Sequence, residues 1–261
     1  MTPAEVLSTD LAEAAQALRD KAEPFAFATI VRTAGATAAK PGAKALLSSD
    51  GTIVHGWLGG GCTNGAVKRV AMQALKDGTP QLVSVAPEDL LAEKGVASGD
   101  EIDGTQFARN GCPSRGTVDI FIEPCLPSPQ LAVMGTSPVA LALSALAPQF
   151  HWSVVASPPE FQPDQTYQKR FTVVATQGQG DMDALKTALS GASTYVAFVG
   201  SKRKFANLAD KLAAAGIDQS LIDAVKAPAG LDLGAVTPEE IALSILAELV
   251  QVRRSAVMTP E

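Results

Sequence analysis

Three glycines followed by a cysteine, Gly59-Gly60-Gly61-Cys62, form the segment of this sequence best suited to chemistry. The segment stands between an expected strand and an expected helix. Glycines have no Cβ, so their backbone N–H groups can approach a ligand closely. The first turn of a helix adds unpaired N–H groups and a partial positive charge. The segment therefore predicts a site for a phosphate or for an anion of the size of a pterin.

The cysteines extend this hypothesis. Cys62 stands at the expected helix N-terminus, a position that favours the thiolate and is expected to lower its pKa. Cys112 lies in a loop beside Arg109 and Arg115, which would act on it in the same way. The two thiols can form a functional pair. The alternatives are a tight turn with a buried, inert Cys62 and an unrelated loop cysteine at position 112.

No metal site is expected. Cys125 falls in a proline-rich linker and looks incidental. A zinc site built from Cys62, Cys112 and His55 lacks the Cys-x-x-Cys spacing typical of structural zinc.

Two glycine-containing turns follow strands in the second half. Gly135-Thr136-Ser137-Pro138 has the position of a dinucleotide-binding loop, but serine replaces the middle glycine and no acidic ribose ligand follows the next strand. Gly200-Ser201-Lys202-Arg203-Lys204 places three cations in the first turn of a helix, against the helix dipole. A bound phosphate or sulfate would relieve this arrangement. A solvated face with screened or paired cations is the alternative.

Alternating patterns predict the elements that position these residues. In the first half, strands are expected at 25–31, 43–47, 53–58, 81–85 and 117–123, a helix runs from Cys62 to about Lys76, and 86–115 is expected to be irregular. In the second half, strands at 131–134, 152–156, 172–175 and 195–199 alternate with helices. The prediction is an α/β domain over residues 1–126, followed by a Rossmann-like, doubly wound parallel sheet over 127–261.

Composition excludes several classes of protein. The 261 residues carry a formal net charge of −6, which argues against nucleic-acid binding. No apolar run of membrane-spanning length and no secretory signal is seen. Three cysteines, an odd number, indicate reduced thiols, and the sequence is typical of a cytoplasmic protein.

Taken together, these motifs resemble the XdhC/CoxI family. The resemblance rests in the first half on 28–35, on Pro41-Gly42-Ala43, on the glycine segment, and on Cys112 before a strand ending in Glu123-Pro124. In the second half it rests on 195–204, 227–235 and 237–242. The chain departs from the usual pattern at Thr63-Asn64 after the cysteine, at 135–138, and at Thr176-Gln177-Gly178.

The resemblance implies a maturation chaperone rather than an enzyme. Such proteins bind the molybdenum cofactor, as molybdopterin or its dinucleotide form, and protect and deliver it to an apo molybdenum hydroxylase of the xanthine dehydrogenase or carbon monoxide dehydrogenase type. They are homodimers and often cooperate with a cysteine desulfurase that supplies a sulfur ligand. Cys62 and Cys112 would contact or help to sulfurate the cofactor. The expected cofactor contacts are Arg32, Gly59, Gly60, Gly61, Cys62, Thr63, Gly135, Gly200, Ser201, Lys202, Arg203 and Lys204.

Two other functions remain open on the sequence. A nucleotide- or flavin-dependent oxidoreductase would use the Rossmann-like half, although fold alone does not give function. A pure interaction subunit would use the glycine segment only as a turn. Binding of NAD(P)H or FAD, or absence of any small ligand, separates these two from the chaperone.

Overall fold

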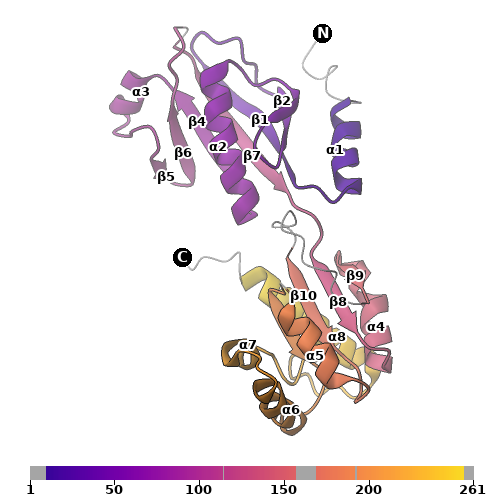
Figure 1. Cartoon of the computed structure of the whole chain (residues 1–261). Helices are drawn as coiled ribbons and strands as arrows, with labels where there is room; N and C mark the ends of the chain where they lie inside the picture. Colours follow the sequence, from indigo (N-terminus) through magenta and orange to yellow (C-terminus); the bar gives the residue numbers. More distant parts are fainter. Residues whose placement is uncertain (1–9, 114, 157–168, 192, 256–261) are drawn as a thin grey trace. The chain divides into compact units, whose positions relative to one another are not determined.

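A computed structural model of the chain describes residues 10–113, 115–156, 169–191 and 193–255. The chain divides into two compact units, Met1–Pro127 and Ser128–Glu261 (Figure 1). The division falls inside the proline-rich segment 124–129. A helix-capping pattern at Thr2 to Glu5, expected from the sequence, lies outside the described residues.

The first unit is built on a mixed seven-stranded sheet in the order β3-β2-β1-β7-β4-β6-β5. Neighbouring strands are antiparallel except β4 and β6, which are parallel. The strands are β1 (Phe25–Ala34), β2 (Lys44–Ser48), β3 (Ile53–Gly56), β4 (Gln81–Ala86), β5 (Glu101–Ile102), β6 (Thr105–Arg109) and β7 (Thr117–Cys125).

Helices cover both faces of this sheet. The long helix α2 (Gly61–Asp77) lies against β7, β4 and β1. Helix α1 (Asp10–Asp20) packs through Leu11 and Ala15 against Phe25 and Leu46. Because side chains alternate along a strand, the pairing of β1 with β7 places Asp119 on the same face as Phe25, opposite α2.

Local signals fix where α2 ends. Gly78 follows the helix with φ 71°, and its N–H donates to the Ala74 carbonyl at 2.8 Å, as the sequence predicts. A Cβ on Gly78 would lie 3.2 Å from Leu126, just beyond the end of β7. Helix α2 therefore begins near the opposite edge of the sheet, where β1 ends and β7 begins.

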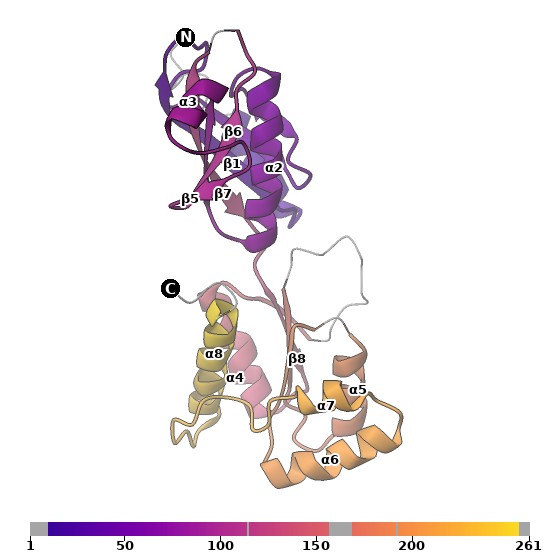
Figure 2. The same ribbon diagram turned by 90° about the vertical axis from the view of Figure 1, so that its left-hand side faces the viewer.

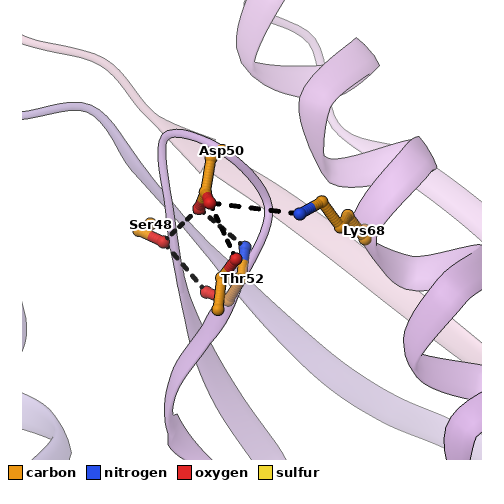
Figure 3. A network of polar contacts seen from close by, with 4 residues as sticks. All are labelled: Ser48, Asp50, Thr52 and Lys68. Carbon is orange, nitrogen blue, oxygen red and sulfur yellow. Dashed lines mark hydrogen bonds and ion pairs between the residues drawn. The ribbon is translucent and has the colours of Figure 1, made fainter.

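A hairpin turn braces α2 near its second turn (Figure 3). The carboxylate of Asp50 accepts hydrogen bonds from the Ser48 hydroxyl at 2.6 Å and from the Thr52 hydroxyl and amide at 2.8 and 3.0 Å. These bonds, that from Ser48 above all, lower the pKa of Asp50 to about 2. Lys68 of α2 lies 3.9 Å from the same carboxylate. A Cβ at Gly51 would lie 2.7 Å from the Lys68 carbonyl oxygen, so the turn requires glycine to approach the helix.

The second unit contains a four-stranded parallel sheet in the order β11-β10-β8-β9. Helices α4 and α8 form a core with one face, and α5, α6 and α7 form a core with the other (Figure 2). The doubly wound, Rossmann-like fold is thus confirmed. Its elements are β8 (Gln130–Met134), α4 (Pro138–Leu146), the 3-10 turn η1 (Ala147–Phe150), β9 (Ser153–Val155), β10 (Arg170–Val174), α5 (Asp181–Ser190), β11 (Tyr195–Phe198), α6 (Lys202–Ala214), α7 (Gln219–Asp223) and α8 (Pro238–Ser255).

The expectation of an irregular segment at 86–115 is wrong. The segment holds α3 (Glu88–Glu93) and the strands β5 and β6. Helix α3 has only six residues and one buried side chain, Leu91. Strand β6 joins the sheet near its edge and carries few apolar residues. Elements this short and polar leave no periodic pattern in the sequence.

Candidate functional site

One edge of the first unit's sheet gathers the loops expected to form a site. Strand β1 ends there, α2 begins there, and the loop from β6 to β7 crosses there. A Cβ on Gly116 would lie 2.5 Å from the Ala36 carbonyl oxygen, which shows how closely the loop after β1 packs against the loop before β7. The glycine segment 59–62 and the loop that holds Cys112 therefore leave the sheet at the same edge.

The start of α2 offers uncapped amides. Gly60 is the N-cap residue and supplies no capping side chain, and the first turn of α2 contains no acidic residue. A Cβ on Gly60 or Gly61 would meet nothing within 4 Å, so the space beside both is open. Free N–H groups at an open helix start can receive an anion. Cys62 is the second residue of α2, and its side chain lies outside the described part of the structure.

Two expected cofactor contacts next to this turn, Gly59 and Thr63, also serve the local packing. Thr63 is buried, and a Cβ on Gly59 would lie 3.1 Å from the Thr63 hydroxyl oxygen. Gly59 is also buried and has φ 139°, a conformation that favours glycine. These residues shape the turn, and the open positions are Gly60 and Gly61.

Asn110 organises the loop that contains Cys112. Its side-chain amide donates to the Gly116 carbonyl at 2.6 Å, and its side-chain oxygen accepts from the Cys112 N–H at 2.9 Å. Cys112 itself is exposed. The loop therefore presents the thiol to solvent on a fixed backbone.

The two arginines on either side of Cys112 also pair with carboxylates of a neighbouring helix. Arg109 pairs with Glu88 at 3.3 Å, and Arg115 pairs with Asp89. Both carboxylates belong to α3, the helix that sequence analysis missed. The pairs are exposed and bind the loop to α3.

Cys125 is not a linker residue, contrary to expectation. It is the last residue of β7 and packs, half-buried, beside the core formed by Leu11, Ala15 and Phe25. Burial raises the pKa of this thiol, which disfavours the reactive thiolate.

Arg32 contacts a buried carboxylate that the sequence did not single out. Its Nε lies 2.5 Å from Oδ2 of Asp119 on β7. The Asp119 side chain is 9% exposed and that of Arg32 is 67% exposed. Asp119 therefore holds the Arg32 guanidinium through Nε, while most of the arginine side chain stays exposed near the edge of the sheet.

Arg32→Ala is expected to lower the free energy of unfolding of the first unit by about 1.5 kcal/mol, because it leaves the buried Asp119 carboxylate without its partner. Adding Asp119→Asn should recover most of this loss. A double-mutant cycle in urea measures both effects. Equal stability of wild type and Arg32→Ala would show that the pair is not coupled.

The glycine turn after β8 is filled by protein. Gly135 has φ 114°, and a Cβ there would lie 2.6 Å from the Ala175 carbonyl oxygen. Ser137 is the N-cap of α4, and its hydroxyl accepts from the Ala140 amide at 3.1 Å. Gly135 therefore lets two loops pack together, and Ser137 uses an amide that a dinucleotide phosphate would need.

The three cations at the start of α6 do not act together. The ammonium of Lys204 lies 2.6 Å from Asp181 and 5.4 Å from the centre of the Phe198 ring. Ser201 caps the helix by accepting from the Lys204 amide at 3.2 Å. Lys202 and Arg203 are exposed, and among the described residues neither has a carboxylate within ion-pair distance. A Cβ on Gly200 would lie 2.4 Å from the Phe198 ring, so this glycine also serves packing.

The stability of this region depends on pH through the carboxylate of Asp181. Burial alone raises the pKa of Asp181, but hydrogen bonds from Lys204, Thr176 and the Gly178 amide outweigh it and hold the pKa below its ordinary value. The stabilisation is present above the unfolded-state pKa of about 3.9 and is lost as pH falls through the lower folded value. The stability difference between wild type and Asp181→Asn should therefore narrow below about pH 4, as urea unfolding between about pH 3 and 7 would show. A difference that stays constant across this range would contradict the assignment.

Sequence reasoning missed Asp119, Asp181, Lys226 and Glu248. Glu248 is buried in α8, where its carboxylate pairs with Lys226 at 3.1 Å. The sequence does contain a signal for Glu248, because this charged residue falls on the apolar face of the helix between Ile245 and Leu249. Its partner lies outside the helix and leaves no such trace.

Among the described residues, no three His, Cys, Asp or Glu side chains are grouped so that they could hold a metal ion. Within the same ranges, no helix combines the length and apolar character needed to cross a bilayer.

Comparison with known proteins gives two family matches. Residues 18–86 match the model of the XdhC and CoxI family, and residues 131–249 match that of the XdhC Rossmann domain. The uncharacterized protein YqeB of Escherichia coli (strain K12) is 29% identical over 257 residues, which cover 89% of this chain and 44% of that protein. The chain thus spans less than half the length of this curated relative.

A solved structure also resembles the chain weakly. A crystal structure described as a xanthine dehydrogenase from Bacillus halodurans aligns with a TM-score of 0.41 and 21% identity, over 93% of this chain and 95% of that one. A score this low supports no argument. The two family matches, one in each unit, together cover most of the sequence. The chain belongs to the XdhC and CoxI family.

Proposed function

We propose that this chain is a maturation chaperone that binds the molybdenum cofactor in its first unit. It protects the cofactor, as molybdopterin or its dinucleotide form, and delivers it to an apo molybdenum hydroxylase of the xanthine dehydrogenase or carbon monoxide dehydrogenase type. The observation that carries this proposal is the uncapped start of α2, where the open Gly60 and Gly61 precede Cys62. Family membership supports the choice of cofactor.

The residues at this helix start fit an anionic pterin. Its phosphate would accept hydrogen bonds from the first amides of α2, whose N-cap residue is a glycine without a capping side chain. The helix dipole favours both the phosphate and a thiolate at Cys62. The cofactor supplies the redox-active molybdenum centre when bound, while the protein binds, orients and shields it.

The two cysteines have related roles in this proposal. Cys62 contacts the cofactor directly. Cys112, exposed on a loop at the same edge of the sheet, contacts the cofactor or receives the sulfur that a cysteine desulfurase supplies. Arg32, anchored by Asp119, offers a cation near that edge. The chain would act as a cytoplasmic homodimer and without turnover of its own.

Mass spectrometry of ligands that co-purify from a molybdenum-replete host tests the proposal. We expect a molybdopterin species at a stoichiometry that rises with molybdenum supply. Protein that carries no pterin, but still co-precipitates a molybdoenzyme subunit, would instead support a pure interaction subunit.

An oxidoreductase role is the second candidate, favoured by the parallel doubly wound sheet of the second unit. The packing of Gly135 and the capping role of Ser137 count against a dinucleotide site after β8. Titration with NAD(P)H and FAD discriminates between the two roles. Micromolar binding with turnover of a small substrate would favour the oxidoreductase.

A further inference from the structure

The second unit contains a cavity at the carboxyl end of β11. Its volume is about 870 Å³, within the range of small-molecule sites. The walls come from the residues that follow β11, from the loop 225–235, and from Ile241 and Ser244 near the start of α8.

The walls of the cavity are held in place. The Gly230 amide donates to Oε2 of Glu248 at 2.8 Å, and the Leu231 amide donates to the Ser244 carbonyl at 3.1 Å. A Cβ on Gly230 would lie 2.4 Å from the Ser244 hydroxyl oxygen, so only glycine allows this contact. Lys226 bonds through its backbone to Val196 and Phe198. The loop therefore forms a fixed wall rather than a loose cover.

The lining carries more lysines than carboxylates although the protein is acidic, and one of its two lysines is paired with a buried glutamate behind the wall. Its described charged residues are Lys202, Lys226 and Asp232, two cations against one carboxylate, in a chain of net charge −6. Glu248, which is 4% exposed, lies 3.1 Å from the Lys226 ammonium and fixes it at the cavity while half of that side chain stays exposed. Among the described residues no carboxylate lies within ion-pair distance of Lys202.

The start of α6 also contributes positive charge to the cavity. Lys202 is the first residue of the 13-residue helix, and Ser201 caps only the Lys204 amide. Lys202 and the helix dipole both favour an anion in the cavity. Such an anion would also offset the unfavourable placement of the Lys202 cation at the positive end of the helix dipole. The apolar wall residues Val199, Leu231 and Ile241 provide contact area for the rest of a ligand.

The position of the cavity argues against a dinucleotide as that ligand. In doubly wound sheets dinucleotides bind at the point where the strand order reverses, here between β8 and β10. The cavity lies beyond β11 instead, and the Gly135 turn does not line it. We propose that this cavity binds a phosphate-bearing small molecule of mononucleotide size, with Lys202 and Lys226 as its phosphate contacts. This site does not depend on the cofactor role proposed for the first unit.

Calorimetric titration of the full chain with ADP tests the proposal. ADP and inorganic pyrophosphate should bind, adenosine should not, and affinity should fall as salt rises. Lys202→Ala should weaken ADP binding by about tenfold or more, because a charged contact to phosphate is lost. Lys211→Ala removes the same charge from the last turn of the same helix, outside the lining, and should change binding less than about twofold.

Lys226→Met provides a second test, with thermal unfolding measured alongside because it leaves Glu248 unpaired. If this variant unfolds, Lys202→Ala decides alone, since that side chain is exposed. Cys62→Ser should keep full ADP affinity whether or not it binds the molybdenum cofactor. Loss of cofactor binding in Lys202→Ala would identify the phosphate as the cofactor's own, and unchanged cofactor binding would identify a free nucleotide. Failure of both ADP and pyrophosphate to bind at millimolar concentration, or equal effects of the Lys202 and Lys211 variants, would overturn the proposal.

Discussion

Cys62→Ser is expected to lower the molybdenum cofactor content of the purified protein by at least about tenfold, which corresponds to about 1.4 kcal/mol of binding free energy. Serine keeps the size of the side chain and the helix start, but it does not ionise near neutral pH. The open space beside Gly60 and Gly61 is unaffected, so the change isolates the sulfur. Pterin content after oxidation, measured by fluorescence, and bound molybdenum, measured by elemental analysis, report the effect.

Cys125→Ser is the matched control for this experiment. That thiol packs beside the α1 core, and burial raises its pKa, so its replacement should leave the cofactor content unchanged. Cys112→Ser should have an effect between those of the other two variants. An unchanged cofactor content in the double variant Cys62→Ser and Cys112→Ser would show that neither thiol is needed to hold the cofactor.

Gly135→Ala is expected to destabilise the second unit by about 2–4 kcal/mol. The residue has φ 114°, and the new Cβ would lie 2.6 Å from the Ala175 carbonyl oxygen and 2.8 Å from Thr176 Cα. Both atoms belong to backbone that follows β10, so neither can move without disturbing the sheet. Denaturant unfolding of wild type and variant measures the loss.

Gly216→Ala separates the two contributions to this effect. Gly216 has φ 83°, but a Cβ there would meet nothing within 4 Å. Only the conformational cost of about 1–2 kcal/mol should remain. If both variants lose the same stability, the close approach to Ala175 does not matter. The absence of a Cβ at Gly135 would then again be explained by the space that a ligand needs.

Local patterns predicted much of the fold. The start of α2 at the glycine segment, its apolar spacing and its end at Gly78 all follow from adjacent residues. The alternation of strands and helices likewise predicted the doubly wound second unit. The short, polar α3 and β6 escaped because they owe their structure to neighbours rather than to their own pattern.

The side-chain partners were much harder to predict. Arg32 and Asp119 are 87 residues apart, and their contact depends on the pairing of β1 with β7. The pairing of Lys204 with Asp181 depends on the order of strands in the second sheet. A sequence shows three cations in a row at 202–204, but only the fold shows that one of them is paired with Asp181. The glycine segment was identifiable because its chemistry lies within four consecutive residues.

Alkylation of Cys62 in the presence and absence of the molybdenum cofactor tests the central claim most directly. Iodoacetamide modification, followed for each cysteine-containing peptide by mass spectrometry under anaerobic conditions, gives the rate at this residue. Cys62 should react faster than Cys125 in the free protein and should be protected once the cofactor binds. A Cys62 that reacts at the same rate with and without bound cofactor would contradict the proposed site at the start of α2.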